Sequence, residues 1–407
     1  MRIAFITTCL EPGKDGVGDY TRDLAAACLS QKCDARLIAL NDRYVGRPHE
    51  EIQLARGAAI QALRLPASST WHERLLVARR FLQQRPADWI SLQFVCYGFH
   101  PKGITLGLGR HLAPLIENRH LHLMLHELWI GARRGASLRE RLIGSIQRRA
   151  VCSLIARLKP AAIHTSNSGY ARLLGNVGVH ARLLPLCGSI PIVADADAGW
   201  LEQELLKLHA TPPAAAERRA QWRFGFFGML PDQWAPEPLF TYIAEAAERA
   251  RRAVAVISIG RIGPGEAVWR DMQARYGHRF RFARLGERSP AEISLFLQSI
   301  DFGIATTPWQ LIGKSASTAA MLDHGLPVLV PRDDVDIGAE GLEAHDPLLQ
   351  RVTAALPAWL LQLHRRAPRD GLAAIAARFT AEIRGAEAPQ PPDAADRSAD
   401  GAGRSRV

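Results

Sequence analysis

The fold is decided by the opening stretch Arg2-Ile-Ala-Phe-Ile-Thr7 and the segment Glu11-Pro-Gly-Lys-Asp-Gly-Val-Gly-Asp-Tyr-Thr-Arg22 behind it. The apolar run predicts a buried strand, and the second segment leads into a helix. Gly16 and Gly18 let the backbone approach a bound group, and the start of the helix offers free N–H groups to an anion or a sugar hydroxyl. The same stretch also fits an ordinary turn in which Asp19 or Thr21 caps the helix.

Short apolar runs alternate with longer helical patterns along the whole chain, which is typical of βαβ units. In the first half, strands are expected at Arg2–Thr7, Ala35–Leu40, Trp89–Phe94, His120–Leu125, Ala162–Thr165 and Arg182–Leu186. In the second half, they are expected at Arg223–Phe227, Ala253–Ile259, Arg279–Leu285, Phe302–Thr306 and Pro327–Val330. Two such series predict an α/β protein with two Rossmann-like, doubly wound parallel sheets that face each other across a cleft.

The length of 407 residues also favours two domains. We place the first domain at 1–190, a polar linker that contains Pro212 and Pro213 at 191–222, and the second domain at 223–385. Residues 386–407 contain almost no large apolar side chains and are expected to be disordered.

Composition excludes some classes of site and of partner. The six cysteines are scattered without a CxxC pair, so neither a zinc site nor a disulfide framework is expected, and no metal is assigned. The formal net charge of +11 favours an anionic partner. Nucleic acid is not expected, because no reader motif is visible. The start of the chain has no signal peptide or spanning segment, so a cytoplasmic location is expected.

Polar residues follow two of the predicted strands of the first half. His126 and Glu127 come directly after His120–Leu125, and Gln93 and Tyr97 stand at the end of the strand before it. Such strand ends lie at the mouth of the cleft in an open α/β sheet. His126 can hydrogen-bond a sugar hydroxyl and Glu127 can accept a proton, so we assign these two as catalytic candidates. Both residues could instead cap loops and contact only water or backbone.

The acceptor side of this site is predicted to contain three polar residues of the first half. These are Asp19, Gln93 and Tyr97.

The second half contains the segment Thr306-Thr-Pro-Trp-Gln-Leu-Ile-Gly-Lys-Ser-Ala-Ser317, which opens a helix. At that helix start, Gly313, Lys314, Ser315 and Ser317 bring together free amides, an ammonium group and hydroxyls, all of which favour a diphosphate. It is not a Walker motif, because the spaced glycine ahead of Gly-Lys-Ser is missing. A purely structural alternative has Ser315 as the helix cap and Lys314 solvated.

Further donor-site candidates stand at the ends of two other strands of the second half. Gly228 follows the strand that ends at Phe227, and Gly260 and Arg261 follow the one that ends at Ile259. Arg261 can form paired hydrogen bonds to a phosphate or to the ribose region.

With these motifs, the chain resembles the GT-B glycosyltransferases, and in particular the retaining group called family 4. The motifs that carry the resemblance are Gly16-Val-Gly-Asp-Tyr-Thr-Arg-Asp-Leu-Ala25, the strand end at His126, Leu184-Pro185-Leu-Cys-Gly188, Phe226-Phe-Gly228, Asp301-Phe-Gly-Ile-Ala-Thr-Thr-Pro308 and Ala320-Met-Leu-Asp-His-Gly-Leu-Pro-Val328. The resemblance implies transfer of a sugar from a nucleotide-diphosphate sugar, bound by the second domain, without a metal or another cofactor. It also implies a glycan, a lipid-linked molecule or a small molecule as acceptor, in the synthesis of the cell envelope or of an exopolysaccharide.

Two departures from that family leave other functions open. The family usually has two glutamates eight positions apart, where this chain has Ile312 and Ala320. It also has a basic pair after the equivalent of Gly228, which is missing here. We hypothesise that Lys314 and Arg261 supply positive charge in place of the missing basic pair. The alternatives are a catalytically degenerate binding or assembly protein with this fold, and a nucleotide-sugar epimerase.

Residues 132–159 form a strongly basic helical pattern, with eight basic residues and one acid, Glu140. Apolar residues recur at helical spacing, so one face is apolar and much of the rest is cationic. Such a helix can lie on an anionic membrane surface, which predicts peripheral contact at the inner face of the membrane. It can equally be an outer helix of the first domain whose apolar face packs on its own sheet.

Overall fold

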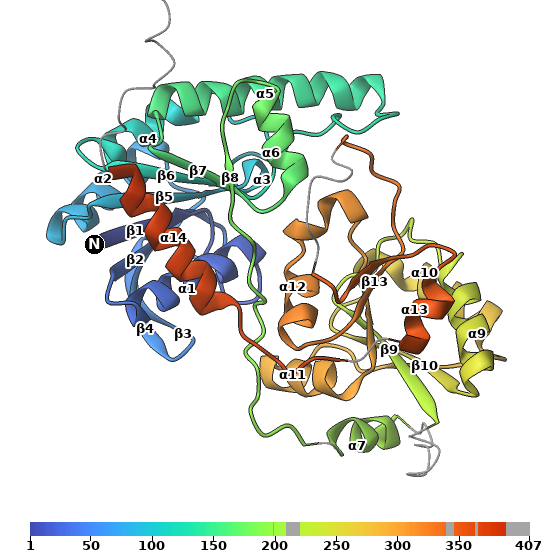
Figure 1. Ribbon diagram of the computed structural model, residues 1–407. Coiled ribbons are helices and arrows are strands. Elements are labelled where there is room, and N and C mark those ends of the chain that lie inside the picture. The colour runs from blue at the N-terminus through green and yellow to red at the C-terminus, as the bar shows by residue number, and fades with distance from the viewer. Residues whose placement is uncertain (198, 209–219, 339–345, 363–364, 388–407) are drawn as a thin grey trace, which may run out of the picture.

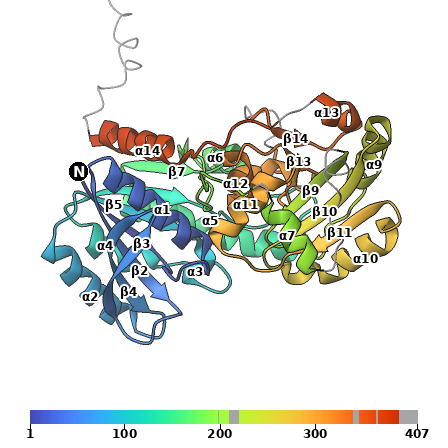
Figure 2. The ribbon, with the colours of Figure 1, turned by 90° about the horizontal axis from the view of Figure 1, so that it is seen from below.

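The computed structural model describes residues 1–197, 199–208, 220–338, 346–362 and 365–387. These residues form two α/β lobes, each built around one sheet (Figures 1 and 2). We call the lobe around the first sheet the first lobe and the lobe around the second sheet the second lobe. The predicted fold class of two facing Rossmann-like domains is confirmed.

The sheet of the first lobe has the strand order β3-β4-β2-β1-β5-β6-β7-β8. Its strands are β1 (Arg2–Thr7), β2 (Asp34–Asp42), β3 (His49–Ala55), β4 (Ala58–Pro66), β5 (Trp89–Phe94), β6 (His120–Leu125), β7 (Ala162–Thr165) and β8 (Arg182–Leu183). The helices between them are α1 (Gly16–Ser30), α2 (Trp71–Gln84), α3 (Cys96–Phe99), α4 (Leu108–Ile116), α5 (Leu138–Leu158) and α6 (Ser168–Gly175). All pairs are parallel except β3 with β4.

The sheet of the second lobe has the order β11-β10-β9-β12-β13-β14 and is parallel throughout. Its strands are β9 (Gln221–Phe227), β10 (Ala253–Ile259), β11 (Phe280–Arg284), β12 (Phe302–Ile304), β13 (Val328–Val330) and β14 (Leu349–Arg351). The helical elements are α7 (Trp200–Lys207), α9 (Leu239–Ala250), η1 (Gly263–Gly265), α10 (Glu266–Tyr276), α11 (Pro290–Ser299), η2 (Trp309–Lys314), α12 (Ala316–Asp323) and α13 (Leu356–Gln362).

Each sheet has an apolar core on both of its faces. In the first sheet, for example, Ile6 and Ile90 belong to one core, while Phe5 and Trp89 belong to the other. The second sheet is covered in the same way by two further clusters. Because both faces are closed, the strand ends are the parts of each sheet that remain for a ligand.

The predicted strands are found, with ends that differ by a few residues, but the hairpin β3–β4 was not predicted. Its two-residue turn, Arg56-Gly57, has positive φ angles of 49° and 77°, as a tight hairpin turn requires. The edge strand β3 alternates exposed and buried side chains, so it lacks the continuous apolar run that marks the buried strands.

The last described helix, α14 (Leu372–Glu387), packs on the first lobe although it follows the second lobe in sequence (Figures 1 and 2). Its side chains Phe379 and Ile383 are buried in the same core as Phe5 and Leu24. The predicted second domain, 223–385, therefore includes a helix that belongs to the core of the first lobe.

The linker and the tail also differ in detail from the prediction. Within the predicted linker 191–222, α7 packs on the second lobe through Leu201 and Leu205, and residues 209–219 lie outside the described residues. In the predicted tail, residues 386 and 387 belong to α14, and residues 388–407 lie outside the described residues.

Candidate active site between the lobes

A pocket of about 460 Å³ lies between the carboxyl ends of the first sheet and the start of α12 in the second lobe. We call it the cleft pocket. Its lining is Lys14, Asp15, Gly16, Val17, Tyr20, Asp23, Arg43, Val95, Tyr97, Gly98, His126, Glu127, Leu186, Cys187, Ser189, Lys314 and Ala316. Four predicted site residues from separate parts of the sequence thus meet here with Gly16, namely Tyr97, His126, Glu127 and Lys314.

The glycine loop that precedes α1 is held by hydrogen bonds to the carboxylate of Asp15 within the loop. Asp15 caps α1, and its side chain accepts hydrogen bonds of 2.9 Å from the N–H groups of Val17 and Gly18. A β-carbon on Gly18 would lie 2.3 Å from the carbonyl oxygen of Cys9, so this glycine permits close packing of α1 on the end of β1. Gly16 has open space around it and lines the cleft pocket.

Asp19 stabilises the same loop. It accepts a hydrogen bond of 3.0 Å from the N–H of Gly13 and forms an ion pair with Arg22. It does not line the cleft pocket. Its contacts give this predicted acceptor-side residue a role in the shape of the loop.

His126 lies at the pocket wall and is only 8 % exposed. Its Nε2 atom is 2.8 Å from Oε1 of Gln93, which is fully buried and does not line the pocket. An amide oxygen only accepts hydrogen bonds, so Nε2 of His126 is the donor. Burial lowers the pKa of His126 to about 3, so the ring is neutral near pH 7. The remaining nitrogen, Nδ1, is then an acceptor.

Glu127 and Lys314 join the two lobes across the cleft pocket. The Nζ atom of Lys314 lies 3.3 Å from Oε1 of Glu127 and 3.4 Å from the hydroxyl of Tyr170. Burial alone would lower the pKa of the Lys314 ammonium, but the nearby Tyr170 and Glu127 outweigh it and the pKa is raised. Lys314 is therefore charged and paired, and the alternative of a solvated lysine is wrong.

The start of α12 is capped by the protein itself. The Ser315 hydroxyl accepts a hydrogen bond of 3.2 Å from the N–H of Thr318 and lies 3.2 Å from the hydroxyl of Ser317. Gly313 touches the first lobe, because a β-carbon there would lie 2.7 Å from the carbonyl oxygen of Ser166. Gly313 and Ser315 line a neighbouring cavity of about 540 Å³, on the other side of this loop from the cleft pocket.

The other donor-site candidates lie at the carboxyl edge of the second sheet. Gly228 and Gly260 have positive φ angles of 91° and 89°, which explains why glycine stands at both strand ends. Arg261 forms an exposed ion pair with Glu287, at 3.1 Å. These residues do not line the cleft pocket.

The structure also shows the surroundings of the two positions where the resembling family has glutamates. Ile312 is buried, and Ala320 is completely buried. A β-carbon on Gly188, just before the linker, would lie 2.6 Å from the Cα atom of Ala320. A longer side chain at position 320 would therefore collide with the segment around Gly188 before it could reach a ligand.

Sequence reasoning missed several residues of the pocket wall. Lys14 and Arg43 bring two cations to it from loops of the first lobe, and Tyr20 packs edge-on against His126 with ring centres 5.1 Å apart. Lys14 lies inside the quoted glycine loop, and Arg43 follows the end of β2. Their position after strands of the first sheet was the available signal.

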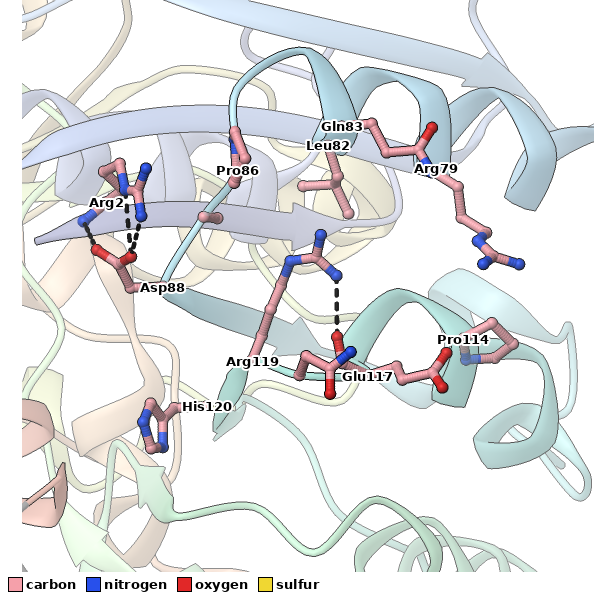
Figure 3. Close-up of a pocket in the computed structure, with 12 residues that line it drawn as sticks. Arg2, Arg79, Leu82, Gln83, Pro86, Asp88, Pro114, Glu117, Arg119 and His120 are labelled. Atoms are coloured by element: carbon pink, nitrogen blue, oxygen red, sulfur yellow. Dashed lines mark hydrogen bonds and ion pairs between the residues drawn. The ribbon is translucent and has the colours of Figure 1, made fainter.

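A cavity of about 730 Å³ lies at the opposite edge of the first sheet, at the amino ends of β1, β5 and β6 (Figure 3). Its arginines are largely used within the protein: Arg2 pairs with Asp88, and Arg119 donates to the carbonyl oxygens of Leu115 and Glu117. None of the predicted site residues lines it.

Among the described residues, no group of three or more His, Cys, Asp and Glu side chains is placed to hold a metal ion.

Comparison with known proteins supports the fold. No protein-family model and no curated protein sequence matches the chain. Among solved structures, HepE of Anabaena in complex with UDP aligns with a TM-score of 0.56 and 15 % identity, over 95 % of this chain and 100 % of that one. A UDP-forming trehalose-phosphate synthase from Burkholderia xenovorans gives a TM-score of 0.54 and 10 % identity, over 95 % and 100 %.

A third similar structure is described as a putative UDP-N-acetylglucosamine 2-epimerase from Listeria monocytogenes. It aligns with a TM-score of 0.53 and 13 % identity, over 96 % of this chain and 98 % of that one. Structures described as a synthase and as an epimerase therefore share the architecture, and the likeness does not extend to the sequence. The chain has the two-domain GT-B fold.

Proposed function

We propose that the protein transfers a sugar from a nucleotide-diphosphate sugar to an acceptor held on the first-lobe side of the cleft pocket. The observation that carries the proposal is the meeting of His126, Glu127 and Lys314 in one pocket between the lobes of a GT-B fold. Such folds bind ligands where the carboxyl ends of their strands face each other.

The pocket wall combines cations with the carboxylates of Asp15, Asp23 and Glu127, and we assign the cations to a diphosphate. Lys314, Lys14 and Arg43 bring three cations from different loops to its wall. In the proposed reaction the acceptor oxygen bonds to the anomeric carbon, the bond from that carbon to the diphosphate oxygen breaks, and these cations stabilise the negative charge on the leaving nucleoside diphosphate. No metal or organic cofactor takes part in this proposal.

The acceptor side has a base and a hydrogen-bond acceptor. The Glu127 carboxylate takes the proton that the acceptor hydroxyl loses, and it passes that proton to solvent. The neutral ring of His126 accepts a hydrogen bond from a sugar hydroxyl through Nδ1. Tyr97 lines the same wall, and its hydroxyl accepts a hydrogen bond of 3.1 Å from Gln147.

The test is the release of UDP from UDP-sugars, measured with and without a metal chelator and with a panel of glycan and lipid-linked acceptors. UDP is the first nucleotide to try, because HepE of Anabaena binds it in a similar fold. We expect acceptor-dependent release that survives the chelator and is lost in Glu127→Gln. Conversion of the donor sugar in the absence of any acceptor would instead identify an epimerase.

A second candidate, a binding or assembly protein without turnover, is favoured by three observations. Lys314 already has a carboxylate partner, Ser315 caps its own helix, and Ala320 leaves no room for the glutamate of the resembling family. Such a protein would bind UDP in calorimetry without releasing it from any UDP-sugar. Binding without turnover would therefore replace the transferase by this candidate.

We further propose that α5 contacts an anionic membrane surface, on the cytoplasmic side, where lipid-linked acceptors of envelope or exopolysaccharide synthesis occur. Leu138 and Leu142 are 84 % and 67 % exposed on this helix, and the neighbouring Arg141 and Arg148 are exposed as well. Exposed leucines beside arginines are typical of helices that lie in the headgroup region. None of the described helices is long and apolar enough to cross a membrane.

Sedimentation with vesicles tests this contact. Vesicles with anionic lipids should bind the protein at low salt and release it at high salt, and Leu138→Ser with Leu142→Ser should weaken binding. Equal binding to neutral vesicles, or none to anionic vesicles, would contradict it. The buried face of α5, which includes Val151 and Leu154, packs on the first sheet, so the outer-helix alternative also describes this helix.

A further inference from the structure

A continuous chain of buried polar side chains connects the cleft pocket to the C-terminal helix. From His126 it passes to Gln93, then to the Ser91 hydroxyl at 2.8 Å, and from there to Nδ1 of His122 at 2.8 Å. Ser91 and His122 are able to meet because they are directly opposite each other in the pairing of β5 with β6.

The chain ends on a carboxylate of α14. The Nε2 atom of His122 lies 2.9 Å from Nδ1 of His164 on β7, and Nε2 of His164 contacts Glu382. Glu382 is also hydrogen-bonded to Arg378 at 2.8 Å. Gln93, Ser91, His122 and His164 are buried, so water does not compete for these bonds.

If Glu382 is ionised, it can only accept a hydrogen bond, and every other bond in the chain then has one possible donor. Burial would raise the pKa of Glu382, but the bonds from Arg378 and His164 lower it, while burial lowers the pKa of both His122 and His164. Glu382 is thus an acceptor, and each histidine is neutral with one N–H.

Starting from Glu382, the direction of each hydrogen bond determines the direction of the next. His164 must donate from Nε2 to Glu382, so its Nδ1 accepts from Nε2 of His122. The Nδ1 atom of His122 then accepts from the Ser91 hydroxyl. Ser91 in turn accepts from the amide of Gln93, whose oxygen is left to accept from Nε2 of His126.

We propose that Glu382, through this chain, fixes the tautomer of His126 so that Nδ1 is always the nitrogen that accepts a hydrogen bond from a ligand hydroxyl in the cleft pocket. Glu382, His164, His122, Ser91 and Gln93 are positioning residues, since they act on a ligand through His126. The ligand part of the statement rests on the proposed function, whereas the tautomer of His126 does not.

The test is nitrogen-15 NMR of protein labelled in the histidine rings, which shows which ring nitrogen is protonated. Comparison with His126→Gln assigns the signals of His126. In the wild type we expect Nε2 of His126 to be protonated and Nδ1 not. Because no sugar donor is needed, failure of this test is distinct from failure of the proposed function.

Two variants break the chain at different points. Glu382→Gln keeps the size of the side chain but removes the charge that imposes the direction, and Ser91→Ala removes the middle link without touching α14. In each variant we expect the Nδ1 signal of His126 to shift toward an average of protonated and unprotonated positions. Arg384→Ala, an exposed position on the same helix, is the control and should leave the signal unchanged.

An Nδ1 signal that stays at its wild-type position in both Ser91→Ala and Glu382→Gln would overturn the proposal, as would a protonated Nδ1 in the wild type. If Glu382→Gln does not fold, Ser91→Ala alone decides. Where UDP release is measurable, the double variant should lose no more activity than either single variant, because both break the same chain. Losses that multiply in the double variant would contradict it.

Discussion

The two edges of the cleft are built in different ways. On the first lobe, His126 is only 8 % exposed and is fixed by fully buried neighbours. On the second lobe, Arg261 and Glu287 pair with each other at 63 % and 69 % side-chain exposure. The first edge is therefore preorganised, while Arg261 is held by an exposed ion pair with Glu287, which water and salt weaken.

The largest effect is expected when α14 no longer packs on the first lobe, because the fixed position of His126 depends on that packing. Phe379 is completely buried, and its ring packs at an angle against Phe5 and edge-on against His122. Phe379→Ala should lower the free energy of unfolding by about 3–5 kcal/mol, because it leaves a cavity in the core of the first lobe. Urea unfolding measures the change. Arg384→Ala on the same helix is the control, and a loss below about 1 kcal/mol in Phe379→Ala would contradict the packing.

On the second lobe, the test is to restore the glutamate of the resembling family. Ala320→Glu should destabilise the protein by about 3 kcal/mol, since it overpacks the contact with Gly188 and buries a carboxylate. Thermal unfolding of this variant is compared with Ala319→Glu, one residue earlier on the same helix and less buried. A stable Ala320→Glu variant with stronger UDP binding would show that the segment around Gly188 can move away from α12.

Between the lobes, Asp323 should make stability depend on pH. Its carboxylate accepts from the N–H of Gly188 at 2.9 Å, and burial raises its pKa from 3.8 to about 6. Since the folded state binds the proton more tightly, its stabilisation is complete below about pH 4 and is lost as the pH rises through about 6, by up to about 3 kcal/mol.

The measurement is urea unfolding from pH 4 to pH 7, in the wild type and in Asp323→Asn. The asparagine variant keeps the size and the acceptor oxygen but does not titrate, so the difference between the two proteins should grow as the pH rises. A constant difference would show that Asp323 has an ordinary pKa.

The smallest effect on stability is expected at Lys314. Its pair with Glu127 is partly exposed, so Lys314→Ala should change the free energy of unfolding by less than about 1 kcal/mol. UDP binding should nevertheless weaken by about tenfold or more, the value of one charged hydrogen bond. Calorimetry measures both Lys314→Ala and the control Arg284→Ala, whose pair with Glu266 lies outside the cleft pocket. Unchanged binding in Lys314→Ala would remove it from the donor site.

Much of the fold could be predicted because it depends on local patterns. Strands such as Trp89–Phe94 and Ala253–Ile259 are buried on both faces, so their apolar runs have the same bounds in sequence and structure. The edge strand β3 is half-exposed and has no such run. The docking of α14 depends on contacts between residues hundreds of positions apart, and its own sequence does not indicate which lobe it covers.

Only those residues of the candidate site that directly follow a buried strand could be predicted. His126 and Glu127 were found because they directly follow a buried strand. The chain of hydrogen bonds that holds His126 was not predicted. The sequence did contain a sign of it, because His122 and His164 are polar residues inside apolar strands. Such residues need buried partners, but only the register of the strands and the position of α14 show which partners they have.

The place of α14 has a consequence for synthesis of the protein. A chain emerges from the ribosome amino end first, and domains usually fold in that order. Here the core of the first lobe includes Phe379, so that lobe remains incomplete until α14 has been translated. The second lobe, whose core contains no residue of α14, can fold earlier. Premature termination before α14 would therefore damage the lobe that was made first.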